Sequence, residues 1–120
     1  MVFFLKHVLS GDRIYLMPGL NMLGRHSNCT GILKYDYMSR FHAIIMVQDG
    51  RLFIREVEAL NGVFVNYSQD RVGVELREIY EGDDLSFGIK LEVPEGILQI
   101  PLTFGIFTVK KVSPPGQIQG

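Results

Sequence analysis

Short apolar runs are separated by groups of turn-forming residues that recur about every ten positions along the chain. The runs are rich in Val, Ile, Phe, Tyr and Leu, and none carries a 3.6-residue apolar period long enough for a helix. Regularly spaced short strands with turns between them are typical of all-β sandwiches and barrels. We therefore expect a two-sheet β-sandwich of roughly ten or eleven strands. The turn-forming groups are Ser10-Gly11-Asp12, Pro18-Gly19, Asp49-Gly50, Asn61-Gly62, Glu81-Gly82-Asp83-Asp84 and Pro94-Glu95-Gly96.

Three segments support more specific predictions. Residues 43–57 indicate a hairpin, because the Asp49-Gly50 pair near their centre suits a type I′ turn. Residues 72–80 could form a helical turn, but Gly73 and two valines favour a strand. Residues 102–112 are expected to be the last strand, which Pro101 can open and in which Gly105 indicates a bulge.

The length and composition are those of one domain. The chain has 120 residues, and 47% of them are hydrophobic, which is enough to bury a core without disulfides. We assign residues 1–112 to this domain. Residues 113–120 are interpreted as a linker or tail, because Pro114-Pro115-Gly116 cannot continue a strand. We expect the chain to be the N-terminal piece of a longer protein.

Charge and composition argue against several classes of partner. The formal net charge is −1 and the 12 Lys and Arg residues are scattered, so direct nucleic-acid binding is not expected. The chain has no apolar stretch of membrane-spanning length, and the apolar residues 1–5 are too few for a signal peptide. Cys29 is the single cysteine, which excludes an internal disulfide and fits the reducing environment of the cytoplasm or nucleus.

Candidate chemistry is concentrated in three blocks, each of which joins polar or turn-forming residues to a strand-like segment. The blocks are Gly24-Arg25-His26, residues 39–43 with Ser39, Arg40 and His42, and residues 61–66 with Asn61 and Gly62. Together they offer guanidinium, hydroxyl and amide groups, but no paired acid and base. Arginine forms planar, charge-assisted hydrogen bonds with phosphate oxygens, and the loops of a sandwich have such groups available. The blocks therefore predict a site that holds an anion.

The order and spacing of these blocks resemble a forkhead-associated (FHA) domain, a reader of phosphothreonine peptides, over most of the chain. The resemblance implies that Arg25 and Ser39 bind phosphate, that Arg40 adds a second contact, and that Asn61 binds the ligand backbone. It also implies that Gly24, His42, Gly62 and Asn66 support the site. Tyr37 corresponds to a position near the ligand residue that lies three after the phosphothreonine.

The resemblance carries a biological setting as well. N-terminal FHA domains are common in scaffolds and checkpoint kinases of the DNA-damage response, which implies a nuclear location; a cytoplasmic one is the alternative. Some FHA domains form homodimers, and Phe3 and Phe4 are candidates for an apolar dimer patch, although a buried first strand explains them equally well.

Two departures from the family pattern define an alternative function. Many FHA domains carry Ser or Thr before the Asn-Gly pair and Thr after it, where this chain has Leu60 and Val63. The loss of one or two hydroxyl bonds, at roughly 0.5–1.5 kcal/mol each, would weaken binding about tenfold. The alternative is thus a structural or dimerisation module with weakened or lost phosphopeptide binding.

Enzymatic chemistry has less support in the sequence. His26 and Cys29 have a metal-like spacing, but no second ligand pair accompanies them, so neither a metal nor another cofactor is expected. Ser39 and His42 lack a nucleophile-elbow motif, and no Walker A or dinucleotide-binding motif occurs. We therefore predict a binding module with no catalytic residues.

Overall fold

The computed structural model describes residues 2–90 and 104–112, which form ten β-strands and no helix. The strands make two five-stranded sheets, with the orders β2-β1-β10-β9-β7 and β4-β3-β5-β6-β8. The predicted all-β sandwich is confirmed. The strands are β1 (Val2–His7), β2 (Arg13–Tyr15), β3 (Gly19–Gly24), β4 (Gly31–Ile32), β5 (Ala43–Gln48), β6 (Arg51–Glu56), β7 (Val63–Val65), β8 (Arg77–Ile79), β9 (Asp84–Phe87) and β10 (Ile106–Val112).

The core lies between the two sheets and follows the alternation of the strands. Ile45 on β5 and Ile54 on β6 are directly paired across the second sheet and are fully buried. Leu5 on β1 and Phe87 on β9 are buried in the first sheet. Since alternate side chains of a strand point to opposite faces, one apolar set from each sheet fills this layer.

The predicted hairpin at residues 43–57 is confirmed. β5 and β6 pair antiparallel from Ala43↔Glu56 to Gln48↔Arg51. Asp49 and Gly50 both have positive φ, 53° and 73°, as a type I′ turn requires. This tight turn fixes the register, and the register determines which side chains of the two strands enter the core.

Other sequence-based expectations are corrected or fall outside the described residues. Only Arg77–Ile79 of residues 72–80 is a strand, because the backbone N–H of Gly73 donates to the Glu56 carboxylate. Gly105 is not a bulge within β10 but precedes it, where its N–H donates to the Tyr37 hydroxyl. Pro101, the turn at residues 94–96 and the predicted tail at residues 113–120 lie outside the described residues.

Phe3 and Phe4 are both buried, with 7% and 5% of their surface exposed. They belong to β1, which pairs with β10 on one side and with β2 on the other. They are therefore part of a covered first strand, which is the second of the two alternatives left open by the sequence; an exposed apolar dimer patch at these residues is not observed.

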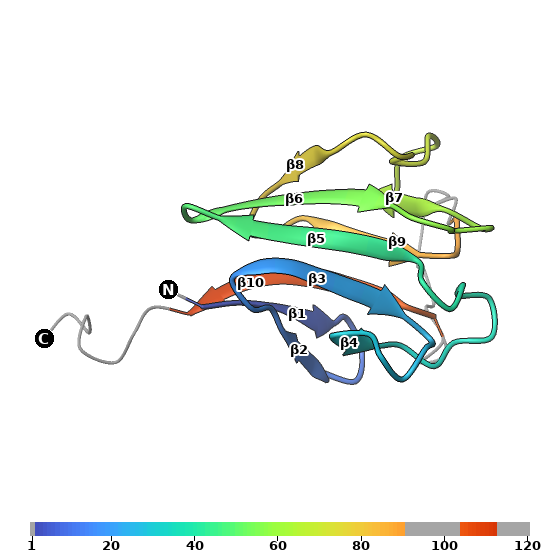
Figure 1. Cartoon of the computed structure of the whole chain (residues 1–120), viewed down its shortest axis with the longest axis horizontal. Helices are drawn as coiled ribbons and strands as arrows, with labels where there is room; N and C mark the ends of the chain where they lie inside the picture. The colour runs from blue at the N-terminus through green and yellow to red at the C-terminus, as the bar shows by residue number, and fades with distance from the viewer. Residues whose placement is uncertain (1, 91–103, 113–120) are drawn as a thin grey trace, which may run out of the picture.

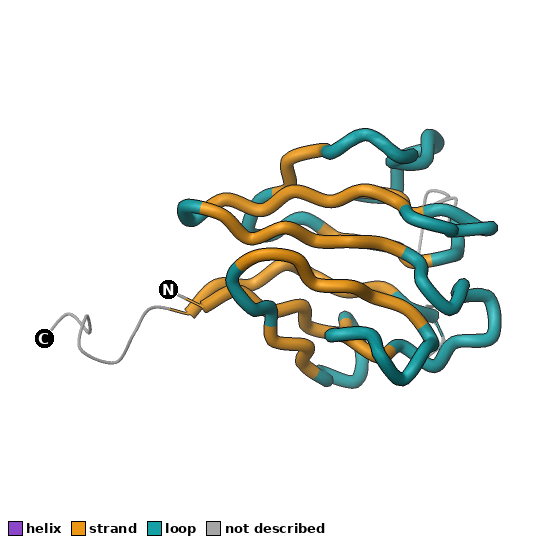
Figure 2. The backbone as a smooth tube through the Cα atoms, viewed as in Figure 1, coloured by secondary structure: helices purple, strands orange, loops and turns teal. Residues whose placement is uncertain are grey.

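The loops that carry the candidate residues gather at one end of the sandwich. Figure 1 shows the β3–β4, β4–β5 and β6–β7 connections at the right-hand end, and Figure 2 shows the same connections as loops. The Asp49-Gly50 turn lies at the opposite end (Figure 1). The fold thus brings together three segments that are separated in the sequence.

Candidate functional site

Hydrogen bonds join the three loops directly. The backbone N–H of Arg25 donates to the Ser39 carbonyl (3.2 Å), which ties the end of β3 to the β4–β5 loop. The Asn61 side-chain amide donates to the Tyr37 carbonyl (2.8 Å), and the Leu60 N–H donates to Ser39 Oγ (3.0 Å). Arg25, Ser39 and Asn61, which the sequence analysis grouped, are therefore neighbours in space.

Gly24 is required by the close approach of the β4–β5 loop. A Cβ atom at this position would lie 2.1 Å from the Arg40 carbonyl oxygen and 3.0 Å from the Ser39 carbonyl oxygen. Both are backbone atoms, so no side-chain rotation would relieve the clash. The missing side chain lets Ser39 and Arg40 pack against the end of β3.

His42 connects two of the loops from inside the protein. Its side chain is fully buried, Nδ1 accepts the Ser39 N–H (3.0 Å), and Nε2 donates to the Gly62 carbonyl (2.6 Å). Because Nδ1 accepts a hydrogen bond, the ring proton lies on Nε2 and the imidazole is neutral. Burial lowers the pKa of His42 and outweighs the opposing effect of the Gly62 bond. The histidine thus holds the Ser39 loop and the Asn61-Gly62 turn together.

Ser39 is presented as a hydrogen-bond donor. Its Oγ accepts the Leu60 N–H, and no described residue accepts the hydroxyl proton. A hydroxyl in this state suits a ligand that only accepts hydrogen bonds, as a phosphate dianion does. Arg25 and Arg40 on either side are exposed, and Arg25 Nε also donates to the Met38 carbonyl. The loop end therefore combines two cationic side chains with an oriented hydroxyl.

An ion pair between the buried Glu56 and the exposed Arg71, next to the Asn61-Gly62 turn, was not predicted from the sequence. Glu56 is 3% exposed, and its carboxylate accepts bonds from Arg71 Nη2 (2.5 Å) and from the N–H groups of Val63 (3.1 Å) and Gly73 (2.9 Å). Burial by itself would raise the pKa of Glu56, but the bonds from Arg71, Gly73 and Val63 hold it below its ordinary value.

Arg71 extends this support to the turn itself. Its guanidinium donates to the Ala59 carbonyl (2.5 Å) and lies so close to Gly62 that a Cβ there would be 3.1 Å from Nε. Gly62 also has a φ of 77°, a conformation that glycine adopts without strain. The β6–β7 loop is thus fixed by Arg71 on one side and by His42 on the other.

Tyr37 and Asn66 both make contacts within the fold. Tyr37 is half-buried, stacks on Tyr35 (ring centroids 5.7 Å apart) and accepts the Gly105 N–H, and burial raises its pKa to about 12. Asn66 has a φ of 51°, and its side chain bonds Asp83 (3.1 Å) and the Asp84 N–H (2.9 Å). It follows β7 at the end opposite to Gly62, and the hydrogen bonds described for it go to Asp83 and Asp84.

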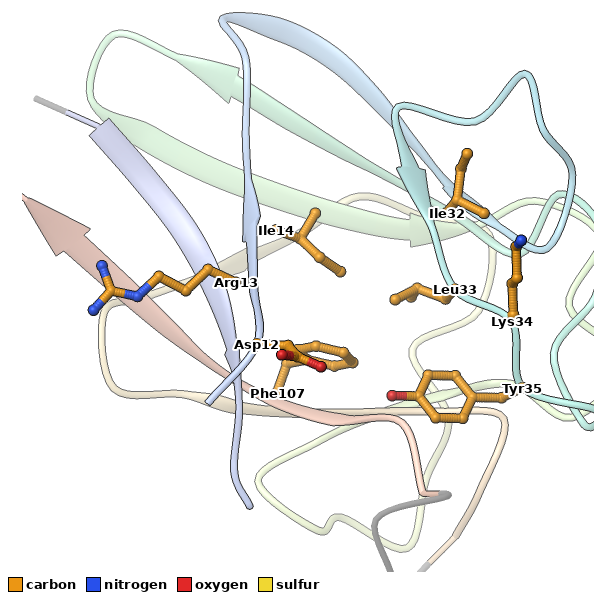
Figure 3. Close-up of a pocket in the computed structure, with 8 residues that line it drawn as sticks. All are labelled: Asp12, Arg13, Ile14, Ile32, Leu33, Lys34, Tyr35 and Phe107. Atoms are coloured by element: carbon orange, nitrogen blue, oxygen red, sulfur yellow. The ribbon is translucent and has the colours of Figure 1, made fainter. Parts of the chain in front are cut away.

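A separate hollow of about 350 Å³ lies between the edge strands β2 and β4 (Figure 3). None of the residues expected to bind phosphate lines it, and its charged residues have both signs. It is therefore not the anion site, although Tyr35 in its wall stacks on Tyr37. The lining residues are Asp12, Arg13, Ile14, Ile32, Leu33, Lys34, Tyr35 and Phe107.

The described part of the chain was also compared with the side-chain cluster of a metal site and with the helix of a membrane span. Residues 2–90 and 104–112 contain no group of three His, Cys, Asp or Glu side chains that could hold a metal ion. Cys29 is buried beside the Arg40 carbonyl, and His26 stacks on Phe41 with ring centroids 4.8 Å apart. Within the same residues, no helix has the length and hydrophobicity of a membrane span.

Solved structures share this architecture. The N-terminal FHA domain of S. cerevisiae Rad53p, in complex with a phosphothreonine peptide, has a TM-score of 0.72 at 16% identity, covering 92% of this chain and 93% of that one. The FHA domain of the Chlamydia trachomatis protein CT664 has a TM-score of 0.69 at 19% identity, covering 94% and 100%. The FHA domain of human APLF, in complex with an XRCC1 bisphospho peptide, has a TM-score of 0.67 at 23% identity, covering 93% and 100%.

Sequence comparison gives the family directly. No curated protein sequence is significantly similar to the chain. The family model of the FHA domain matches residues 21–88, which run from within β3 past the end of β9 and include all three loops of the candidate site. The chain belongs to the FHA domain family.

Proposed function

We propose that this domain binds phosphothreonine-containing segments of partner proteins and catalyses no reaction. The observation that carries the proposal is the state of Ser39: its hydroxyl accepts the Leu60 N–H and keeps its proton for an acceptor, between the exposed Arg25 and Arg40. A phosphate brings about −1.5 to −2 charges near neutral pH and only acceptor oxygens. The three side chains offer it charge-assisted and neutral hydrogen bonds at a rigid loop end.

Asn61 supplies recognition of the ligand's backbone in this proposal. Its side-chain nitrogen donates to the Tyr37 carbonyl, and no described residue donates to Oδ1, so this oxygen can accept a hydrogen bond from a peptide N–H. Asn61 is exposed and directly follows Leu60, so a peptide whose phosphate reaches Ser39 passes beside it. The pairing of phosphate and backbone contacts is that of a phosphopeptide reader.

The alternative function, a module that has lost phosphopeptide binding, is weakened by the position of Val63. Its side chain is fully buried, so it faces the core and does not replace a ligand contact. Leu60 is the remaining departure from the family pattern at the surface of the site. Phe3 and Phe4 are buried as well, so a dimerisation module would need another surface. No specific observation favours this alternative.

Binding of a phosphothreonine peptide library tests the proposal. We expect enrichment of phosphorylated over unphosphorylated peptides, and a loss of at least tenfold in affinity for Arg25→Ala, because hydrogen bonds to charged groups contribute about 1.5–3 kcal/mol each. Arg25→Lys should restore only part of the affinity, since lysine lacks the planar guanidinium. The matched control is Arg51→Ala, whose residue pairs with Glu78 at the Asp49-Gly50 end of the sandwich.

The proposal is contradicted if the folded domain binds phosphorylated and unphosphorylated peptides equally. Because Arg25 Nε also bonds the Met38 carbonyl, the melting temperature of Arg25→Ala has to be measured beside its affinity. Equal losses in Arg25→Ala and Arg51→Ala would also count against a specific phosphate contact.

The biological setting in this proposal is DNA-damage or checkpoint signalling in the nucleus. Its support is the resemblance to N-terminal FHA domains of such proteins. The test is the location of the tagged protein in cells before and after DNA breaks are induced. Recruitment to the breaks that depends on Arg25 is the expected result; a cytoplasmic protein that does not respond would contradict the setting without affecting peptide binding.

A further inference from the structure

Leu60 has a large apolar side chain that is exposed to solvent beside the proposed phosphate site. It is 83% exposed, more than any other large hydrophobic side chain in the described part of the chain. A single exposed leucine on a protein surface needs no explanation by itself. The position of this leucine differs because its backbone N–H is 3.0 Å from Ser39 Oγ.

That bond places the side chain next to the ligand. With an N–Cα bond of about 1.46 Å, the Leu60 Cα lies no more than about 4.5 Å from Ser39 Oγ. An extended peptide advances about 3.3–3.6 Å per residue. The Leu60 side chain is therefore within reach of the ligand residues one or two positions from the phosphothreonine.

Three hydrogen bonds hold the chain around Leu60, so the position of its backbone is set before a ligand arrives. The preceding carbonyl, of Ala59, accepts a bond from Arg71, and the following side chain, of Asn61, donates to the Tyr37 carbonyl. The Leu60 N–H is fixed by Ser39 itself. Contacts made by a preorganised group lose less affinity to ordering than contacts made by a mobile one.

From this geometry we infer that Leu60 is a specificity residue that selects an apolar side chain next to the phosphothreonine. The inference rests on the proposed function and adds the class of ligand: a phosphothreonine segment with Leu, Ile, Val or Met within two residues of the phosphate. In this arrangement the leucine replaces a hydroxyl contact to the phosphate with an apolar contact to its neighbour. The contact between Leu60 and the apolar ligand side chain also excludes water from one side of the hydrogen bonds to the phosphate.

The test uses the peptide library with the wild-type domain, Leu60→Ser and Leu20→Ser. Leu20 is the matched control, since it is 67% exposed on β3 and lies four residues from Gly24, toward the other end of that strand. We expect the wild type to select an apolar residue at one position within two of the phosphothreonine. Between two peptides that differ there by Leu and Ser, the wild type should discriminate about tenfold, as expected for burial of roughly half a leucine side chain.

Leu60→Ser should lose this discrimination while keeping its preference for phosphorylated peptides, and Leu20→Ser should behave as the wild type. The inference is overturned if phosphate-dependent binding shows no apolar preference in that window, or if Leu60→Ser retains the preference. Binding that does not depend on phosphate at all is a different result, because it overturns the proposed function and the inference with it. Both leucines are exposed, so all three proteins should unfold at similar temperatures.

Discussion

Individual residues in this domain act mainly by fixing the backbone of the loops that carry the charged groups. Gly24 is the clearest example, because the Arg40 carbonyl oxygen lies where the Cβ atom of any other residue would be. His42 acts in the same way from the core, through the Ser39 N–H and the Gly62 carbonyl. The geometry of Ser39 is therefore set by residues that do not face the ligand.

Gly24→Ala is expected to destabilise the fold by about 1–3 kcal/mol, as overpacking typically does, and to abolish phosphopeptide binding. The added methyl group would push Ser39 and Arg40 away from β3 and break the Arg25 N–H to Ser39 carbonyl bond. Denaturant unfolding and peptide titration measure the two effects. Gly19→Ala is the control: it has a φ of 88° but no atom within 4 Å of the added Cβ, so it should lose stability while keeping affinity.

At the scale of elements, the β6–β7 connection is held by a residue from beyond β7. Glu56 at the end of β6 is bonded by Arg71, which also holds the Ala59 carbonyl of the loop that precedes Asn61-Gly62. The pair links the loop that carries Leu60 and Asn61 to the segment between β7 and β8.

Removing one partner of this pair should affect both stability and binding. Arg71→Met leaves the buried Glu56 carboxylate without its cation, and we expect a loss of about 1–2 kcal/mol in the free energy of unfolding, less than for a fully buried pair because the Arg71 side chain is 47% exposed. Peptide affinity should fall as well, because the loop loses the bond to Ala59. Arg51→Ala, which breaks the exposed pair with Glu78, should change stability little and leave affinity unchanged. Equal effects of the two substitutions would contradict a special role for Arg71.

For the molecule as a whole, the sequence predicts the architecture better than the supporting contacts. Apolar alternation and turn residues are local signals, and they predict the sandwich and the Asp49-Gly50 hairpin correctly. The spacing of Arg25, Ser39 and Asn61 identifies loops that do meet in space. The Glu56–Arg71 pair, like the bond between Gly105 and Tyr37, joins residues that no local pattern connects. Such contacts depend on how the sheets pack, so the sequence alone carries no signal for them.

Two buried titratable groups, His42 and Glu56, should make the stability of the whole domain fall in two stages as the pH decreases. The pKa of His42 is lowered from 6.5 by burial, so below about pH 6.5 the unfolded chain binds this proton first and the free energy of unfolding decreases. The pKa of Glu56 lies below 4.5, so its contribution is complete above about pH 4.5 and is lost at lower pH. Each stage has a limiting slope of about 1.4 kcal/mol per pH unit.

Denaturant unfolding at a series of pH values measures both stages. His42→Asn should flatten the curve between pH 7.5 and 5.5, while the decrease that begins near pH 4.5 remains. Since protonation of Nδ1 removes the acceptor of the Ser39 N–H, the serine loop should lose hydrogen-exchange protection in the first stage, before the sandwich unfolds. If stability depends on pH between 7.5 and 5.5 as steeply in His42→Asn as in the wild type, another group causes the first stage. That result would contradict the assignment of a neutral His42 that holds the serine loop. If the slope between pH 7.5 and 5.5 disappears in His42→Asn, and the serine loop of the wild type opens in that same range, then the protonation of His42 controls Ser39. The link between them is the single bond from the Ser39 N–H to Nδ1 of His42.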